Sequence, residues 1–264
     1  MPSVVAPTFR LTTLVAPVLG ASCHVLSATG SGPCLVVDAG GGVAPALHAH
    51  LVEHDLVPVA VLATHGHLDH VWDGPLVTDD AGIPFVLHEA DAHRLADPFG
   101  TLDPWGVRGP LVQAVAQQGV HVDETRVPGR VMTFAGERTL LVGAGGLLGE
   151  DTLGPGVTVE AVHAPGHTEG STLYVVSAVP DDSSVLPRLG RPRAVVTSTV
   201  LTGDVLFAGS VGRTDLPGGD GAVMARTLRD VVATLPGDAL VLPGHGPATT
   251  VGHETATNPY LARR

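Results

Sequence analysis

Short apolar runs alternate with polar and Gly/Pro-rich turns along the whole chain. Runs of Val, Leu and Ala bounded by turn residues are typical of buried β-strands. On this basis strands are expected at 11–23, 25–28, 34–38, 59–63, 83–87, 138–142, 157–162, 172–177, 194–201 and 239–242.

Helical spacing of apolar residues marks other segments. In 45–55 the apolar Leu47, Leu51 and Val52 lie opposite polar His48 and His50, which predicts an amphipathic helix. Further helices are expected at 89–96, 107–118 and 222–235.

The order of these elements predicts the fold class. Strands come first, and strands then alternate with helices, twice over, which favours an α/β protein with a four-layer αβ/βα sandwich. A length of 264 residues suits one domain, residues 1–264. The segment 97–156 fits the pattern least and is interpreted as an inserted loop or lid, and 180–192 as a polar, Pro-rich surface loop.

Composition excludes several classes of protein and of binding partner. The chain is 44% hydrophobic and 15% charged, which excludes a mostly disordered protein. Its formal net charge is -12, and all 14 basic residues are Arg, so no basic stripe is expected for a nucleic acid. No apolar run is long enough to span a bilayer. Cys23 and Cys34 lack metal or redox spacing, so both are expected to be buried in a cytoplasmic protein.

Four of the predicted strands end in loops that carry His or Asp. The strand 59–63 leads into His-Gly-His-Leu-Asp-His, and three later loops carry one such residue each. Crowded polar groups are costly unless something binds them, and imidazole and carboxylate suit Zn, Fe or Mn. We therefore predict a metal site made by His65, His67, Asp69, His70, His167, Asp204 and His245.

Most other histidines are interpreted as surface or hydrogen-bonded side chains, because a lone His is seldom a metal ligand. This group comprises His48, His50, His54, His88, His93, His121 and His253. The Gly-rich stretch 39–43 lacks the spacing of a phosphate-binding loop and is expected to be a strand-to-helix turn.

These motifs together resemble the metallo-β-lactamase superfamily, and within it the glyoxalase II-like hydroxyacylglutathione hydrolases. The resemblance is carried by HxHxDH at 65–70 and by the segments 165–171, 201–207, 212–215 with 218–220, 243–246 and 249–260. It implies two divalent metal ions, most simply Zn, with Fe or Mn as alternatives. His65, His67 and His167 would hold one ion, Asp69, His70 and His245 the other, and Asp204 would bridge them.

The resemblance also implies roles for two residues outside the ligand set. Asp38, at the end of a strand, would brace the metal loop. Arg213 would grip a substrate carboxylate, an interpretation that assumes a buried guanidinium, with an ion pair to Asp215 as the alternative.

The expected reaction is hydrolysis of a small-molecule thioester such as S-lactoylglutathione or a mycothiol analogue. A hydroxide that bridges two metals attacks the carbonyl carbon, and a thiol of pKa about 8.5 leaves without full protonation. Asp69 would bind metal and also manage a proton. Related enzymes use Lys near the thiol peptide, and this chain has none, so either Arg substitutes or the carrier thiol differs.

Other activities of the same superfamily are the main alternatives. A persulfide dioxygenase uses a single iron, but those relatives tend to have Pro-Gly-His-Asp where this chain has Pro-Gly-His-Gly at 243–246. A lactonase could use the same site, whereas true β-lactamases usually lack a bridging Asp such as Asp204. The negative charge argues against a nuclease, and the full ligand set argues against a non-catalytic scaffold. The oligomeric state is left open.

Overall fold

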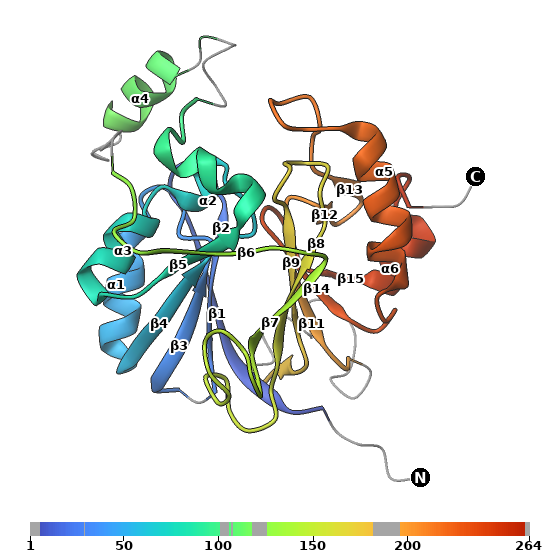
Figure 1. The fold of residues 1–264 in the computed structure, drawn as a ribbon, viewed down its shortest axis with the longest axis horizontal. Helices are drawn as coiled ribbons and strands as arrows, with labels where there is room; N and C mark the ends of the chain where they lie inside the picture. The colour runs from blue at the N-terminus through green and yellow to red at the C-terminus, as the bar shows by residue number, and fades with distance from the viewer. Residues whose placement is uncertain are drawn as a thin grey trace.

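The computed structural model describes residues 6–28, 30–100, 106, 108–117, 126–181 and 196–261. Within them, two β-sheets face each other and helices cover the outer faces, as Figure 1 shows. This arrangement confirms the predicted α/β sandwich.

The first sheet combines antiparallel and parallel pairs, in the order β10-β1-β2-β3-β4-β5-β6. The β1–β2–β3 pairs are antiparallel, and β3 to β6 run parallel. Its strands are β1 (Thr8–Val15), β2 (Ser22–Ser27), β3 (Gly32–Val37), β4 (Leu56–Leu62), β5 (Phe85–His88), β6 (Val131–Phe134) and β10 (Val179–Pro180).

The second sheet has the order β15-β14-β11-β9-β8-β7. Its pairs are antiparallel except for the parallel pair of β11 and β14. Its strands are β7 (Arg138–Val142), β8 (Val159–His163), β9 (Thr172–Val176), β11 (Thr199–Gly203), β14 (Leu240–Pro243) and β15 (Thr249–Thr250), and a separate hairpin joins β12 (Leu206–Phe207) to β13 (Ser210–Val211).

Helices lie on both outer faces of the sandwich (Figure 1). Beside the first sheet are α1 (Ala44–Glu53), α2 (Leu68–Val71), α3 (Gly74–Ala81), the 3₁₀ helix η1 (Glu89–Ala96) and α4 (Arg108–Gln117), and beside the second are α5 (Gly221–Asp230), the 3₁₀ turn η5 (Val232–Thr234) and α6 (Val251–Thr257).

Caps fix where these helices begin. Asp73 directly precedes α3, and its carboxylate accepts a hydrogen bond from the Ala44 N–H at 2.7 Å, which pairs the first N–H of α1. The side chain of Asp220 accepts from two N–H groups of α5, and the Thr250 hydroxyl accepts from one of α6. Such caps satisfy N–H groups that the helix itself leaves unpaired.

Separate apolar clusters hold the layers together. One lies between the two sheets, with Leu35, Leu62, Tyr174 and Leu201 fully or almost fully buried. A second lies under α1 and α3, and a third under α5 and α6. Because each layer contact has its own buried cluster, the packing does not depend on the polar loops at the sheet edges.

Several predicted elements are confirmed, and a few boundaries are wrong. The single strand expected over 11–23 is wrong: a turn at 16–21 divides it into β1 and β2. Leu19 and Gly20 adopt φ of +62° and +77° there, which reverses the chain. Similarly, the helix expected over 222–235 ends at Asp230 and is followed by a 3₁₀ turn.

The segment 97–156, interpreted as a loop or lid, contributes to both sheets. Its residues 131–134 form β6 and residues 138–142 form the predicted strand β7. Residues 101–105, 107 and 118–125 lie outside the described part of the chain, as do 182–195, which include most of the predicted surface loop. No helix among the described residues is long and apolar enough to cross a membrane.

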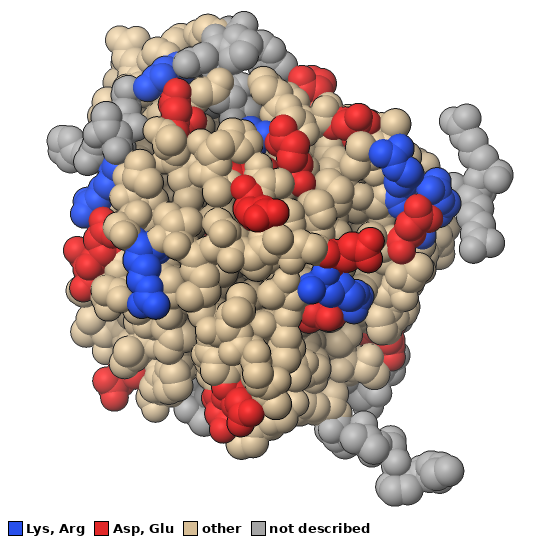
Figure 2. All heavy atoms as spheres, viewed as in Figure 1, with Lys and Arg blue, Asp and Glu red and all other residues tan. Residues whose placement is uncertain are grey.

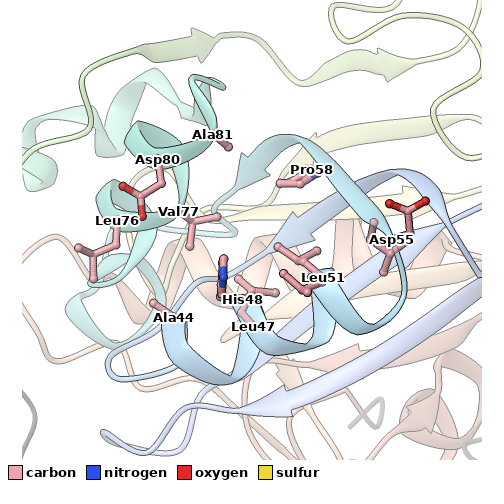
Figure 3. A pocket seen from close by; sticks show the side chains of 12 residues that line it. Ala44, Leu47, His48, Leu51, Asp55, Pro58, Leu76, Val77, Asp80 and Ala81 are labelled. Atoms are coloured by element: carbon pink, nitrogen blue, oxygen red, sulfur yellow. The ribbon is translucent and has the colours of Figure 1, made fainter.

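The outer surface carries mixed charges and an apolar groove. On the face in Figure 2, Arg side chains lie beside Asp and Glu. Surface ion pairs of the molecule include Arg138–Glu160 and Arg229–Asp230. A groove of about 470 Å³ lies between α1 and α3, lined by Leu47, Leu51 and Val77 among others (Figure 3). None of its lining residues is a predicted metal ligand.

Candidate metal centre

The predicted ligands meet where strand ends from both sheets converge. Residues 64–70 follow β4, His167 lies between β8 and β9, Asp204 follows β11 and His245 follows β14. Hydrogen bonds join the sheets at this edge: the Thr172 N–H donates to the Thr64 carbonyl at 2.8 Å, and the Tyr174 hydroxyl donates to the Ala63 carbonyl at 2.7 Å. The loops therefore rest on a rigid junction.

Three imidazoles form the first group of ligand atoms, called here the three-histidine group. His67 Nδ1 lies 3.1 Å from His65 Nε2 and 2.8 Å from His167 Nε2, and the last two atoms are 3.2 Å apart. All three side chains are buried. Nitrogens that share a tetrahedral zinc at about 2.0–2.1 Å lie roughly 3.3 Å apart, so this spacing suits one metal ion.

Hydrogen bonds on the far side of two rings set their orientation. His167 Nδ1 donates to the Arg213 carbonyl oxygen at 2.7 Å, and His65 Nδ1 lies 3.1 Å from the Thr64 hydroxyl. Both contacts leave Nε2 facing the shared point. Ligands held in this way keep one tautomer and one orientation.

The three imidazoles are also in the right protonation state for metal binding. Burial lowers the pKa of His65 well below its usual value and lowers the pKa of His67 to about 3, with neighbouring histidines acting in the same direction. Burial also lowers the pKa of His167. Each ring is therefore neutral at pH 7 and offers a lone pair.

Asp69, His70 and His245 form the second group. His245 Nε2 lies 3.1 Å from Asp69 Oδ2, and His70 Nε2 lies 3.7 Å from the same oxygen. Burial alone would lower the pKa of His70, but the carboxylates of Asp69, Asp38 and Asp204 have a larger, opposite effect, so the net shift of this pKa is upward. Burial alone would raise the pKa of Asp69, but the nearby His70 and His245 rings lower it by more, so the carboxylate is ionised.

Asp204 lies between the two groups. Its Oδ2 is 3.7 Å from His167 Nε2 and 3.8 Å from His245 Nε2, and its Oδ1 is 3.4 Å from His70 Nε2. One carboxylate thus reaches a ligand of each group, which is the position that a bridging ligand needs.

Asp38 supports the second group from behind. Its Oδ2 accepts from His70 Nδ1 at 2.9 Å and from the Thr64 hydroxyl at 2.8 Å, and its Oδ1 accepts from the Thr64 N–H at 2.7 Å. Asp38 adopts φ of +61°, which is uncommon for a residue with a side chain. The structure therefore places Asp38 where the sequence predicted a brace for the metal loop.

The donor set fits divalent metal ions. His67 Nε2, His70 Nε2 and Asp204 Oδ1 are buried without a hydrogen-bond partner. Such atoms are costly inside a protein, and metal binding nearby offsets that cost for the last two, which face the ligand cluster. Imidazole nitrogens and ionised carboxylates are ligands for Zn, Fe and Mn.

A protein-family model matches the part of the chain that contains most of the predicted ligands. The model of the metallo-beta-lactamase superfamily matches residues 16–177, which include the HxHxDH loop and His167. The chain belongs to the metallo-beta-lactamase superfamily. Members of this superfamily with His and Asp groups of this kind bind divalent metal ions, and the structure places overlapping groups of this kind at the strand ends.

Several relatives match this chain in sequence over most of their length. An uncharacterised protein of Mycobacterium tuberculosis is 34% identical over 95% of this chain and 97% of its own. A Bacillus subtilis protein named "probable metallo-hydrolase" is 32% identical over 86% and 87%. A Haemophilus influenzae protein named hydroxyacylglutathione hydrolase is 29% identical over 84% of each chain.

Two solved structures are also similar to this chain. The B3 metallo-beta-lactamase BLEG-1 has a TM-score of 0.66 at 27% identity, and the match covers 96% of this chain and 100% of that one. TTHA1623, solved in a di-iron-bound form, has a TM-score of 0.64 at 25% identity over 95% and 100%.

Arg213 differs from the sequence interpretation. Its side chain is 53% exposed, and its guanidinium pairs with both carboxylate oxygens of Asp215 at 2.7 and 2.8 Å. The assumption of a buried guanidinium is therefore wrong, because the chain reaches the surface at Arg213, directly after the buried Gly212. The backbone of Arg213, through its carbonyl, is what contacts the ligand set.

Sequence reasoning missed two residues that shape the site. Thr64 links Asp38 to His65 through its hydroxyl, and its place directly before the HxHxDH motif could have suggested this role. Asp91 lies 21 positions beyond His70 in η1, and nothing in its local pattern distinguishes it from a surface carboxylate.

Proposed function

We propose that the chain is a two-metal hydrolase of a small thioester, such as S-lactoylglutathione or its analogue on mycothiol. The observation that carries the proposal is the position of Asp204, whose carboxylate lies between the three-histidine group and the second group. Two ligand groups that share a carboxylate are the arrangement expected of a dinuclear hydrolase.

The relatives support this choice of reaction. The Haemophilus influenzae protein carries the name of a thioester hydrolase, and the Bacillus subtilis protein that of a metallo-hydrolase. The di-iron form of TTHA1623 supports two ions at this site. We propose Zn as the resident metal, with Fe or Mn as alternatives, and a cytoplasmic location.

The residues of the site would orient the substrate and the attacking water, and one of them would accept a proton. Bound divalent ions lower the pKa of water and polarise a carbonyl oxygen. Asp69 and His245 are the ligands nearest to solvent, at 19% and 29% side-chain exposure. Because Asp69 is ionised, its carboxylate can take up the proton that an attacking water releases.

The leaving group fits a site with few proton donors. A thiol has a pKa of about 8.5, so a thiolate departs without full protonation. An amine would need a donor, and the side chains at the centre are ligands already engaged with each other. The site therefore suits a thioester better than an amide.

The test combines metal content with turnover. We expect about two equivalents of metal per chain and faster hydrolysis of lactoyl thioesters than of a lactone or β-lactam. His167→Gln should abolish turnover. His48→Gln is a matched control, because His48 is an exposed residue of α1 and is not one of the predicted ligands.

Two results would overturn the proposal. One iron per chain with oxygen consumption on glutathione persulfide would indicate a dioxygenase. Fully metallated protein with no thioesterase activity on either lactoyl thioester would exclude the proposed substrate class.

A further inference from the structure

Asp91 is a fully buried carboxylate that sequence patterns did not single out. It belongs to η1, which follows β5 of the first sheet. Its Oδ2 accepts from the Gly66 N–H and the Thr168 hydroxyl, both at 2.7 Å. Its Oδ1 accepts from the Gly170 N–H at 2.8 Å and from Arg94 Nε at 3.3 Å.

Three of these four partners flank the three-histidine group. Gly66 lies between His65 and His67, and Thr168 and Gly170 lie in the loop that carries His167. The first loop comes from the first sheet and the second loop from the second sheet. One carboxylate therefore holds together the two loops that must meet to bring these imidazoles within 3.2 Å of each other.

The loops are built for this close approach. A Cβ atom on Gly170 would lie 2.6 Å from Asp91 Cγ and 2.8 Å from Asp91 N, closer than side-chain carbons pack. On Gly66 a Cβ would lie 2.7 Å from Arg94 Cδ and 3.1 Å from the Asp91 carbonyl. Both loops carry glycine at the point where they contact η1, so that Asp91 can reach their backbones.

Arg94 balances the charge of the buried carboxylate. Its side chain is 5% exposed, and besides Asp91 it contacts the Glu169 carboxylate and, at 3.1 Å, the Pro217 carbonyl. A buried carboxylate with a cation and backbone donors around it is strongly held. Asp91 is thus a fixed point rather than a mobile side chain.

The second ligand group has a different support. Asp38 contacts His70 and Thr64, whereas the four hydrogen bonds of Asp91 described above reach none of Asp69, His70 and His245. We propose that Asp91 is the positioning residue of the three-histidine metal site and leaves the second site largely unaffected. This inference rests on the two-metal site of the proposed function.

Asp91→Asn tests this role, because Asn has nearly the same size and shape as Asp but lacks its charge and one acceptor oxygen. Each Asp91 oxygen accepts from a backbone N–H, Gly66 on one side and Gly170 on the other. Whichever oxygen becomes an NH₂ group therefore faces a donor that it cannot pair with. Loss of a hydrogen-bonding partner of a ligand loop typically lowers metal affinity about 10- to 100-fold.

The experiment measures Co²⁺ affinity by absorption titration in two single-site backgrounds. His245→Gln leaves the three-histidine site, and His167→Gln leaves the second site. We expect Asp91→Asn to weaken Co²⁺ binding about 10- to 100-fold in the first background. In the second background the affinity should stay within about twofold, as for uncoupled sites.

Asp73→Asn is the matched control, because Asp73 is also buried and accepts from the start of α1 rather than from a ligand loop. Equal weakening in both backgrounds, no weakening, or the same loss with Asp73→Asn would overturn the inference. If Asp91→Asn fails to fold, Thr168→Val removes one Asp91 contact instead. It should weaken Co²⁺ binding in the first background by a smaller factor and leave the second background unchanged. Wild-type protein that binds fewer than two Co²⁺ ions contradicts the two-metal proposal instead.

Discussion

His24 illustrates how one buried side chain at the edge of the site responds to pH. It is 4% exposed, its Nδ1 lies 2.9 Å from the Thr13 hydroxyl, and its Nε2 has no hydrogen-bond partner. Burial lowers the pKa of His24 to about 4, although Asp38 and the Pro243 carbonyl act in the opposite direction. The folded protein therefore keeps His24 neutral at pH 5–7.

The low pKa of His24 predicts acid sensitivity. In the unfolded chain a His has a pKa of about 6.5, so below that pH only the unfolded state takes the proton. The contribution of His24 to stability is full above pH 6.5 and is lost as the pH falls towards 4. Thermal melts of metal-free protein from pH 7.5 to 4.5 should show a smaller decrease for His24→Gln, and an unchanged decrease would contradict the prediction.

Asp69 carries the second prediction at this scale. Because its ionised carboxylate lies at the solvent side of the ligand cluster, we expect it to accept a proton during turnover as well as to bind metal. Asp69→Asn should lower kcat for thioester hydrolysis about 10²- to 10⁴-fold. A variant with full metal content and an unchanged rate would exclude this role.

At the scale of elements, a buried network fixes the C-terminal helix α6 to the β12–β13 hairpin. Glu254 accepts from the Thr249 hydroxyl at 2.6 Å, the Gly209 N–H at 2.8 Å and the Asn258 amide at 2.8 Å. The hairpin leads directly to Arg213, whose carbonyl orients His167. The tail therefore supports the metal centre without contacting it.

Removing this carboxylate should destabilise the protein. Glu254→Ala removes the acceptor of two donors on buried residues, the Thr249 hydroxyl and the Asn258 amide, so we expect a loss of about 2–4 kcal/mol in the free energy of unfolding. Glu160→Ala, which removes only a surface ion pair, should cost less than about 1 kcal/mol. Urea denaturation measures both values, and equal losses would show that the network contributes nothing.

Sequence patterns predicted best where chemistry or periodicity is local. The HxHxDH loop lies within six residues, and the strands around 59–63 and 172–177 follow from apolar runs. The turn at Leu19 was missed because its positive φ leaves no mark on a largely apolar segment. Asp91 was missed because its role depends on loops 25 and 79 residues away, which only the folded structure brings near.

At the scale of the whole molecule, the metal centre joins two sheets that are already packed. The apolar cluster between the sheets contains none of the predicted ligands. We therefore expect chelation to leave the far-UV circular dichroism spectrum unchanged while it lowers the melting temperature.

The size of that decrease follows from ligand linkage. A metal present at 1,000 times its Kd adds about 4 kcal/mol to the stability of the folded state. Calorimetry with and without chelator measures the shift, and re-addition of Zn²⁺ should restore it. Loss of the strand spectrum on chelation would show instead that the ligands are needed for folding.

Each ligand group combines residues that are far apart along the chain. His67 and His167 are separated by 100 positions, and Asp69 and His245 by 176. Closing such long loops has an entropic cost that a single ion cannot repay while the chain is still unfolded. A zinc finger, with its ligands close in sequence, can fold around its metal, whereas this chain must complete its architecture before any ion finds a site.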